Sequence, residues 1–371
     1  MKKLFSSVMV VTLLVASLSG CGSSSAATSN TSGETTEVNV SGNTSDVNIV
    51  FIPKLTGNAF FESANDGAQE YAKKQGYTVK YDGSPEASVA NQVTVINNAV
   101  QQSADAIVVS SVDSTGLDAA LKEAKKAGLQ IVTWDSDVSA NARSIMVSQG
   151  TPEQLGEMLI DMAVDSLKER GVDPEKDEVK YVWHYSQATV ADQNSWQVAG
   201  EAYVAEKYPN WINVAPSNYY SEQDAEKAIS VGESILSAHS DIDLIICNDS
   251  TALPGQLQAA QNMGLTKENV TITGFASPNS IKDYCKAGLI SRWGLWDCKI
   301  QGALATSIAY YLVNGNTVKV GDVIDVPEIG KVEVMPNTVL DPSAYTAEDS
   351  GVVILPERAV FTIDNVDNYN F

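Results

Sequence analysis

Polar side chains stand at the points where several short apolar runs of the sequence end. They are Lys54, Asp135, Asp192, Gln193, Asn248 and Ser250. In open sheets of parallel strands, ligands bind at the carboxyl ends of the strands. We therefore expect polar groups at these boundaries to form a ligand-binding site.

Their types suit a small polyhydroxylated ligand. A carboxylate accepts charge-assisted hydrogen bonds from neighbouring hydroxyls, and Lys54 donates to ring or hydroxyl oxygens. Aromatic faces pack on the apolar faces of sugar-like rings, and the expected ligand wall is Phe60, Phe61, Trp134 and Trp296. Each residue alone also has a structural reading, because a strand-end Asp commonly caps a helix and a Trp in an apolar run is usually core.

Catalytic motifs are scarce in the sequence. It contains no Gly-x-Ser-x-Gly elbow and no glycine-rich phosphate loop before a helix, and its two histidines, His184 and His239, lie in a strand and at a helix end. Cys247, Cys285 and Cys298 lack zinc-site spacing and allow at most one disulfide. We predict no catalytic residue, metal or cofactor, although a glycosidase carboxylate pair and a Schiff-base lysine stay open.

The net charge of the chain argues against some classes of binding partner. The 371 residues carry 24 Lys and Arg against 46 Asp and Glu, a net charge of -22. Nucleic-acid binding and attachment by a polybasic surface are therefore not expected. The 44% of hydrophobic residues is enough for a large core.

The elements that position the site alternate along the chain. Short apolar runs predict buried parallel strands at Val47–Lys54, Thr78–Gly83, Ala106–Val112, Gln130–Asp137, Ile145–Gln149, Val179–Ser186, Leu244–Asp249 and Val270–Ser277. Helical periodicity predicts helices near 59–75, 88–102, 115–127, 152–170, 193–208, 223–239 and 252–264. This order predicts an α/β fold with helices on both faces of parallel sheets.

The units form either one barrel or two doubly wound, Rossmann-like domains with a ligand cleft. Two domains are favoured, because Asp137–Arg143 replaces an expected helix and suggests passage to a second sheet at Ile145–Gln149. Residues 318–334 and 352–361 read as strands without intervening helices, which suits hinge crossings. The expected first lobe is 47–137 plus about 276–318, and the second is 138–275 plus about 319–371.

The N-terminus has the pattern of a lipoprotein leader. Lys2 and Lys3 precede an uncharged apolar stretch, and Leu18-Ser19-Gly20-Cys21 resembles the lipobox of bacterial lipoproteins. We expect residues 1–20 to be a signal peptide and Cys21 to be lipidated. Of residues 22–46, 18 are Ser, Thr, Gly or Asn, so 21–46 is expected to be a lipidated flexible tether. The predicted location is outside the cytoplasm, anchored to the cell membrane.

Several segments of the body resemble one family. They are Phe51-Ile-Pro-Lys-Leu, Gly67-Ala-Gln, Tyr81-Asp-Gly, Thr133-Trp-Asp-Ser-Asp, Gln149-Gly-Thr-Pro, Thr189-Val-Ala-Asp-Gln-Asn, Ala252-Leu-Pro, Gly294-Leu-Trp-Asp and Leu355-Pro-Glu-Arg. The chain from about residue 47 onward resembles the sugar receptors of the ribose-binding superfamily, and more closely the LsrB-type autoinducer-2-binding proteins. The resemblance implies two α/β domains joined by three crossings.

The resemblance also implies a function. Its ligand contacts fall on Lys54, Asp135, Asp192 and Gln193, which match in type, and on Asn248 and Ser250, where the family has Pro and Ala. It implies a monomeric receptor that holds a boron-free, hydrated cyclic form of autoinducer-2 and delivers it to an ABC permease. The two departures keep ribose, rhamnose or another small sugar open as the ligand.

Overall fold

The computed structural model describes residues 37–39, 47–215 and 217–371. The expected signal peptide and the lipidation site Cys21 lie outside the described residues. Within the range expected to be a tether, β1 (Glu37–Asn39) pairs in parallel with β13 (Val323–Val326), which pairs with β14 (Gly330–Glu333). A flexible tether throughout 21–46 is therefore wrong for these three residues.

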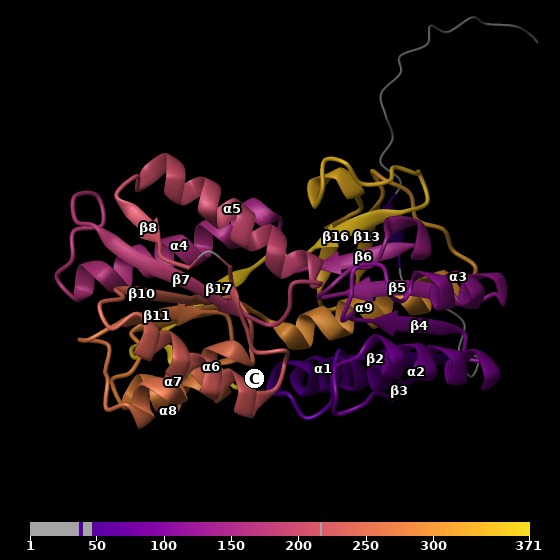
Figure 1. Cartoon of the computed structure of the whole chain (residues 1–371). Coiled ribbons are helices and arrows are strands. Elements are labelled where there is room, and N and C mark those ends of the chain that lie inside the picture. Colours follow the sequence, from indigo (N-terminus) through magenta and orange to yellow (C-terminus); the bar gives the residue numbers. More distant parts are fainter. Residues whose placement is uncertain (1–36, 40–46, 216) are drawn as a thin grey trace, which may run out of the picture. The chain divides into compact units, whose positions relative to one another are not determined.

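The first large sheet has the strand order β15-β16-β6-β5-β4-β2-β3 in the described chain (Figure 1). Its strands are β2 (Asn48–Ile52), β3 (Thr78–Tyr81), β4 (Ala106–Val109), β5 (Gln130–Trp134), β6 (Ile145–Ser148), β15 (Met335–Pro336) and β16 (Gly351–Ile354). All neighbours are parallel except β15 and β16.

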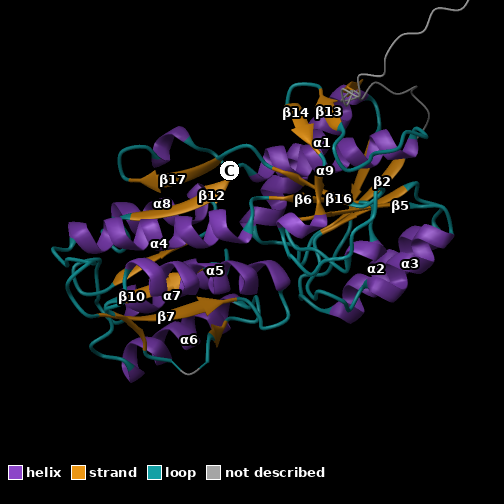
Figure 2. Ribbon diagram, turned by 90° about the horizontal axis from the view of Figure 1, so that it is seen from above, coloured by secondary structure: helices purple, strands orange, loops and turns teal. Residues whose placement is uncertain are grey.

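Helices cover both faces of this sheet, as Figure 2 shows. The pair α1 (Ala59–Gln75) and α9 (Cys298–Val313) packs on one face, and α2 (Val89–Gln101) with α3 (Asp118–Lys126) packs on the other. Successive residues of a strand point to opposite faces, so in β2 Phe51 joins the α1 side of the core whereas Ile52 joins the α2 side. This two-sided burial explains the continuous apolar runs of the sequence.

The second large sheet has the order β11-β10-β7-β8, with β9 also paired to β7, and its pairs are parallel. The strands are β7 (Val179–Tyr185), β8 (Trp211–Asn213), β9 (Tyr219–Tyr220), β10 (Leu244–Cys247) and β11 (Thr271–Gly274). The helices are α4 (Pro152–Glu169), α5 (Ala191–Lys207), α6 (Ala225–Ala238), α7 (Ala252–Asn262) and α8 (Pro278–Lys286). Helices α4 and α5 lie above the sheet in Figure 1, with α6 and α7 below it.

Two strands beside the second sheet form an antiparallel pair. They are β12 (Arg292–Trp296) and β17 (Arg358–Thr362), and a parallel bridge between Phe275 and Gly294 joins β12 to the end of β11. The chain therefore passes between the sheets three times, after β6, after β12 and after β16.

Four strands of these sheets, β6, β12, β15 and β16, depart from the expected division of the chain. Ile145–Ser148 pairs with Gln130–Trp134 in the first sheet, so the expected passage to a second sheet at this strand is wrong. The connection before it is a short 3-10 turn, Ala140–Ala142, held by the Arg143–Asp137 ion pair, and it returns the chain without a helix. Strands β15 and β16, expected in the second lobe, also join the first sheet, whereas β12, expected in the first lobe, joins the second sheet.

The prediction of an α/β fold with two doubly wound sheets is confirmed, and two separate open sheets rule out a single barrel. Among the described helices, none is long and apolar enough to cross a bilayer.

Candidate functional site

The polar residues predicted at strand ends surround one cavity between the two sheets. Its volume, counted with the open space at its mouth, is about 350 Å³. The lining residues are Lys54, Phe60, Phe61, Asp135, Gln193, Trp196, Gln223, Asn248, Asp249, Ser250, Phe275, Leu295 and Trp296. Eight of the ten residues predicted to bind or wall the ligand are among them, and the exceptions are Asp192 and Trp134.

Lys54 and Asp135 form a buried ion pair on the first-sheet side of the cavity. Their Nζ and Oδ2 atoms are 3.0 Å apart, and the residues are 3% and 5% exposed. Ser110 Oγ donates to the same carboxylate oxygen at 2.6 Å. Asp135 has a left-handed backbone, with φ of 58°, which an Asp tolerates better than most side chains. The turn after β5 thereby aims the carboxylate at Lys54.

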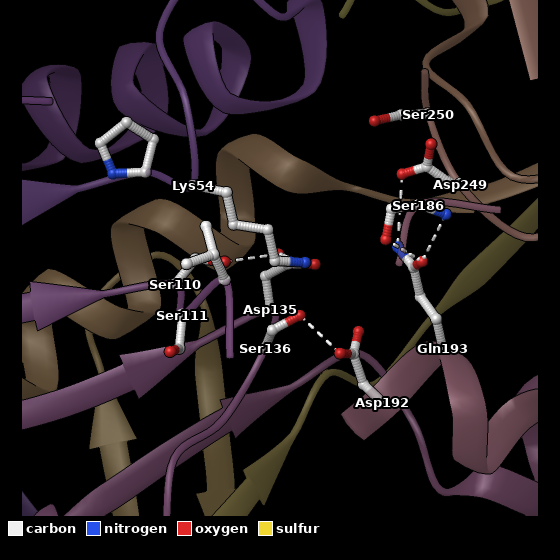
Figure 3. A network of polar contacts seen from close by, with 12 residues as sticks. Lys54, Ser110, Ser111, Asp135, Ser136, Ser186, Asp192, Gln193, Asp249 and Ser250 are labelled. Atoms are coloured by element: carbon white, nitrogen blue, oxygen red, sulfur yellow. Dashed lines mark hydrogen bonds and ion pairs between the residues drawn. The ribbon is translucent and has the colours of Figure 1, made fainter. Parts of the chain in front are cut away.

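Asp192 reaches the same cluster from the first turn of α5. Its Oδ1 accepts a 2.5 Å hydrogen bond from Ser136 Oγ, which follows β5, so this bond joins the two sides (Figure 3). Its Oδ2 is buried and has no hydrogen-bond partner in the described chain. Although Asp192 lies along an adjoining groove rather than in the cavity wall, it is close enough to Lys54 to influence its charge.

The pKa values follow from burial and from these neighbours. Burial alone lowers the pKa of Lys54, but Asp135, Asp192 and Asp249 outweigh it and raise the pKa above the ordinary value. Burial raises the pKa of Asp192 to about 6, with Lys54 opposing the rise and Asp135 adding to it. Burial likewise raises the pKa of Asp249. Lys54 is therefore an ammonium group at neutral pH, which disfavours it as a Schiff-base nucleophile.

Gln193 anchors a hydrogen-bond network on the second-sheet side. Its Oε1 accepts from the backbone N–H and the hydroxyl of Ser186, at 3.2 and 2.5 Å, and its Nε2 donates to Asp249 Oδ1 at 3.3 Å. Asn248 Nδ2 donates to the Gln193 carbonyl at 2.9 Å, whereas Asn248 Oδ1 is buried without a partner in the described residues. The amide nitrogens of Gln193 and Asn248 thus each have one protein partner.

Asp249 and Ser250 tie the cavity to α7 and to the opposite side. Asp249 Oδ2 accepts from the backbone N–H groups of Thr251 and Ala252, at 3.0 and 2.8 Å, which caps α7. Ser250 Oγ donates to Asn58 Oδ1 at 3.4 Å, and Asn58 Nδ2 donates to Thr251 Oγ1 at 3.2 Å. These contacts join the start of α1 to the start of α7 across the cavity.

Aromatic rings form the apolar part of the wall. Phe60, Phe61 and Trp296 line the cavity as expected, but Trp134 is fully buried behind Phe60, with ring centroids 6.1 Å apart. Trp134 belongs to the core because its side chain points to the α1 face of the sheet, where it also stacks on Phe51.

Five lining residues were missed from the sequence. They are Trp196, Gln223, Asp249, Phe275 and Leu295. Two had a usable signal, since Trp196 lies three positions after Gln193 on the same helix and Asp249 follows the end of β10. Gln223 had none, because it lies in the short segment between β9 and α6.

The two histidines and the three cysteines of the described chain take no part in the cavity wall. His184 is buried against Gln256, and His239 at the end of α6 contacts the Tyr219 hydroxyl at 2.8 Å. Cys247, Cys285 and Cys298 are free, buried thiols, so the disulfide that their number allowed is not formed. No three His, Cys, Asp or Glu residues of the described chain are grouped to hold a metal ion.

Two doubly wound sheets with a polar and aromatic cavity between them define a class of small-solute receptors. The periplasmic binding protein domain matches residues 49–317, and the chain belongs to this family. Family membership implies a location outside the cytoplasm. The family consists of solute-binding receptors rather than enzymes.

The chain is similar to several individual solute-binding proteins. The chain is similar to the structure of LsrB from Clostridium saccharobutylicum in complex with AI-2, with 68% identity and a TM-score of 0.87, over 88% of this chain and 100% of the other. It is also similar to an L-rhamnose-bound solute-binding protein from Clostridium phytofermentas, at 22% identity and a TM-score of 0.78, over 88% and 99% of the two chains, which shows the fold alone. The ribose import binding protein RbsB of Bacillus subtilis is 23% identical over 71% of this chain and 80% of its own.

Proposed function

We propose that this chain is an extracytoplasmic receptor for autoinducer-2 and delivers it to an ABC importer. The observation that carries the proposal is the 68% identity to an LsrB structure that holds AI-2 and is covered along its whole length. The cavity supports the same conclusion independently, because its charges and unpartnered atoms select a ligand of that chemical type.

The charge balance favours a neutral ligand rich in hydroxyls. Asp135, Asp192 and Asp249 surround a single ammonium group, Lys54, so acceptors exceed donors in this cluster. One of these carboxylate oxygens, Asp192 Oδ2, is buried without a partner in the described chain, as is the amide oxygen Asn248 Oδ1, and leaving such atoms unsatisfied is costly. A ligand that donates several O–H groups meets this demand, whereas a phosphate or carboxylate ligand would add repulsion.

The same argument favours the boron-free form of autoinducer-2. A borate ester carries a negative charge, and the cluster holds three carboxylates against one lysine. The hydrated cyclic form is neutral and offers hydroxyls to Asp135, Asp192 and Asn248, with Lys54 donating in return. The rings of Phe60, Phe61 and Trp296 would cover its apolar face.

Binding is expected to favour the closed arrangement of two lobes. We place the first lobe at about 47–148 and 297–355 and the second at about 149–296 and 356–371, following the sheet membership of the strands. A ligand that bonds to Lys54 on one side and Gln193 on the other stabilises the closed state more than an open one. The closed form would then be recognised by the membrane permease, with the receptor acting as a monomer held by lipid on Cys21.

A second candidate ligand is a small sugar such as ribose or rhamnose. Asn248 and Ser250 add an amide and a hydroxyl at positions where the LsrB pattern has Pro and Ala, and the free acceptor on Asn248 suits an additional sugar hydroxyl. A catalytic role is disfavoured because Lys54 is charged and held by Asp135.

Ligand release tests the proposal directly. Protein purified from a host that makes autoinducer-2 should, after heat denaturation, release material that activates an autoinducer-2 reporter. The same protein from a host unable to make the signal should release none. Equal release from both preparations, or calorimetric binding of ribose or rhamnose in preference to autoinducer-2, would contradict it.

A further inference from the structure

Gln223 is a buried cavity residue with an unused donor. It lies between β9 and α6, is 7% exposed and lines the cavity together with Asn248 and Asp249. Its Nε2 is buried and has no hydrogen-bond partner in the described chain. A buried N–H without a partner is costly, so such a group in a ligand cavity points to a partner that the ligand brings.

The other side-chain amides of the cavity wall differ from Gln223 because each amide nitrogen already has a protein partner. Gln193 Nε2 is engaged by Asp249, and Asn248 Nδ2 by the Gln193 carbonyl. Trp296 Nε1 donates to Gln301 Oε1 at 2.7 Å. Among the amide nitrogens of the wall, Gln223 Nε2 is thus the one without a protein partner in the described residues, and it follows β9 on the second-sheet side, whereas the Lys54 ammonium follows β2 on the first-sheet side.

The backbone holds Gln223 in place at a conformational cost. Glu222 and Gln223 are consecutive non-glycine residues with left-handed backbones, with φ of 52° and 59°. Backbone N–H groups of Ser221 and Glu222 donate to the carbonyls of Tyr185 and Ser186, each at 2.8 Å. The Gln223 N–H donates to Ser221 Oγ at 3.2 Å. The segment is thus pinned to the end of β7, beside the site.

We propose that Gln223 is a specificity-determining ligand contact that donates a hydrogen bond to one acceptor oxygen of the bound molecule, opposite Lys54. The inference rests on the proposed function in that it names a further contact in the same site. A ligand that offers an acceptor oxygen to the Gln223 amide binds more tightly. An analogue that lacks this oxygen leaves the amide without a hydrogen-bond partner and binds more weakly.

Calorimetric titration of Gln223→Met tests the inference, because methionine keeps the length of the side chain and removes the amide. We expect autoinducer-2 to bind about two- to tenfold more weakly, the range for a neutral hydrogen bond. Gln223→Glu should weaken binding further at pH 7, since it adds a carboxylate to an acidic cavity, and its deficit relative to the wild type at the same pH should shrink as the pH falls. Gln258→Met on α7, outside the cavity wall, is the matched control and should bind like the wild type.

Analogues that each lack one oxygen separate ligand contact from a structural role. Gln223→Met should lose affinity for the parent ligand but not for the analogue that lacks the accepted oxygen. The inference is overturned if the variant binds autoinducer-2 as tightly as the wild type, or if it loses the same factor for every analogue. If the wild type binds ribose or rhamnose instead of autoinducer-2, the proposed function is wrong. The affinities of the wild type and Gln223→Met are then compared with that sugar and its analogues. No binding of any of the three would overturn both.

Discussion

Two buried acidic clusters follow the same strand and have opposite character. Asp137, two residues after Asp135, pairs with Arg143 at 2.6 Å, and this guanidinium also donates to Asn337 Oδ1, Ser350 Oγ and the Gly351 carbonyl. Thr133 Oγ1 donates to Asp137 at 2.6 Å. Neither side chain of this clamp has a buried polar atom without a partner in the described chain. By contrast, Gln223 and Asn248 in the cavity wall and Asp192 beside it each have one.

The contrast distinguishes structural from ligand-binding charge. The charges of the Arg143–Asp137 clamp are satisfied within the protein, and the clamp fastens the turn after β5 to the C-terminal strand β16. Its role is therefore to stabilise the fold. The cavity around Lys54 and Asp135 holds excess carboxylate and unused donors and acceptors, which a ligand can complete. Removing a charge should therefore lower stability in the clamp and affinity in the cavity.

The largest expected effect is on stability. Arg143→Met leaves Asp137 and three further acceptors without their buried donor, and breaking a buried ion pair in this way costs about 3–5 kcal/mol. The free energy of unfolding from urea denaturation should fall by that amount, while autoinducer-2 affinity stays at the wild-type value. Lys126→Met, which removes an exposed ion pair with Glu123, serves as the control and should leave both unchanged. If Arg143→Met lost autoinducer-2 affinity but kept the wild-type stability, Arg143 would belong to the ligand site rather than to the clamp.

A matched pair of substitutions tests the cavity side. Asp135→Ala removes a charged acceptor of ligand hydroxyls and should weaken autoinducer-2 binding by about 1.5–3 kcal/mol, or roughly 10- to 150-fold. Asp137→Ala makes the same chemical change two residues away and should lower stability without this loss of affinity, whereas Asp135→Ala, which leaves Lys54 buried without its partner, should lower both. Calorimetry and urea denaturation on both variants give the comparison. Similar affinity losses in the two would show that the clusters are not distinct.

The pH dependence of binding tests Asp192. Its pKa in the folded chain, about 6, lies above the ordinary value, so its contribution to unliganded stability is present at low pH and declines as the pH rises through 6. The ionised form accepts ligand hydroxyls more strongly, so affinity should rise between pH 5 and pH 7. Asp192→Asn should flatten both trends. A wild-type affinity that falls over this interval would contradict the assigned role.

The smallest expected effect is at Ser250. Its hydroxyl makes a neutral hydrogen bond, worth about 0.5–1.5 kcal/mol, so Ser250→Ala should cost less affinity than Asp135→Ala or Asp192→Ala. Titrations of the three variants under one condition rank them. The reverse order would show that the neutral contacts, rather than the carboxylates, hold the ligand.

Much of this arrangement could be predicted from the sequence because strand ends and charge types are local features. Lys54, Asp135 and Gln193 were identified because each follows a readable element boundary. How deeply a side chain is buried depends on tertiary packing and not on the neighbouring sequence. For this reason Trp134, adjacent to Asp135, was expected in the cavity wall but lies in the core. Gln223 could not be anticipated, since its approach to the cavity depends on the pairing of β9 with β7 and on two left-handed residues. The placement of Ile145–Ser148 likewise depends on a tertiary contact, the Arg143 clamp.

Calorimetric titration of the wild-type chain with autoinducer-2, in buffer with and without borate, tests the central claim most directly. The account predicts saturable binding of one ligand per chain in borate-free buffer. Added borate should weaken the apparent affinity, because it converts the neutral ligand to an anion that the carboxylates repel. Tighter binding in borate, or no binding of autoinducer-2 under conditions where ribose or rhamnose binds, would contradict the claim.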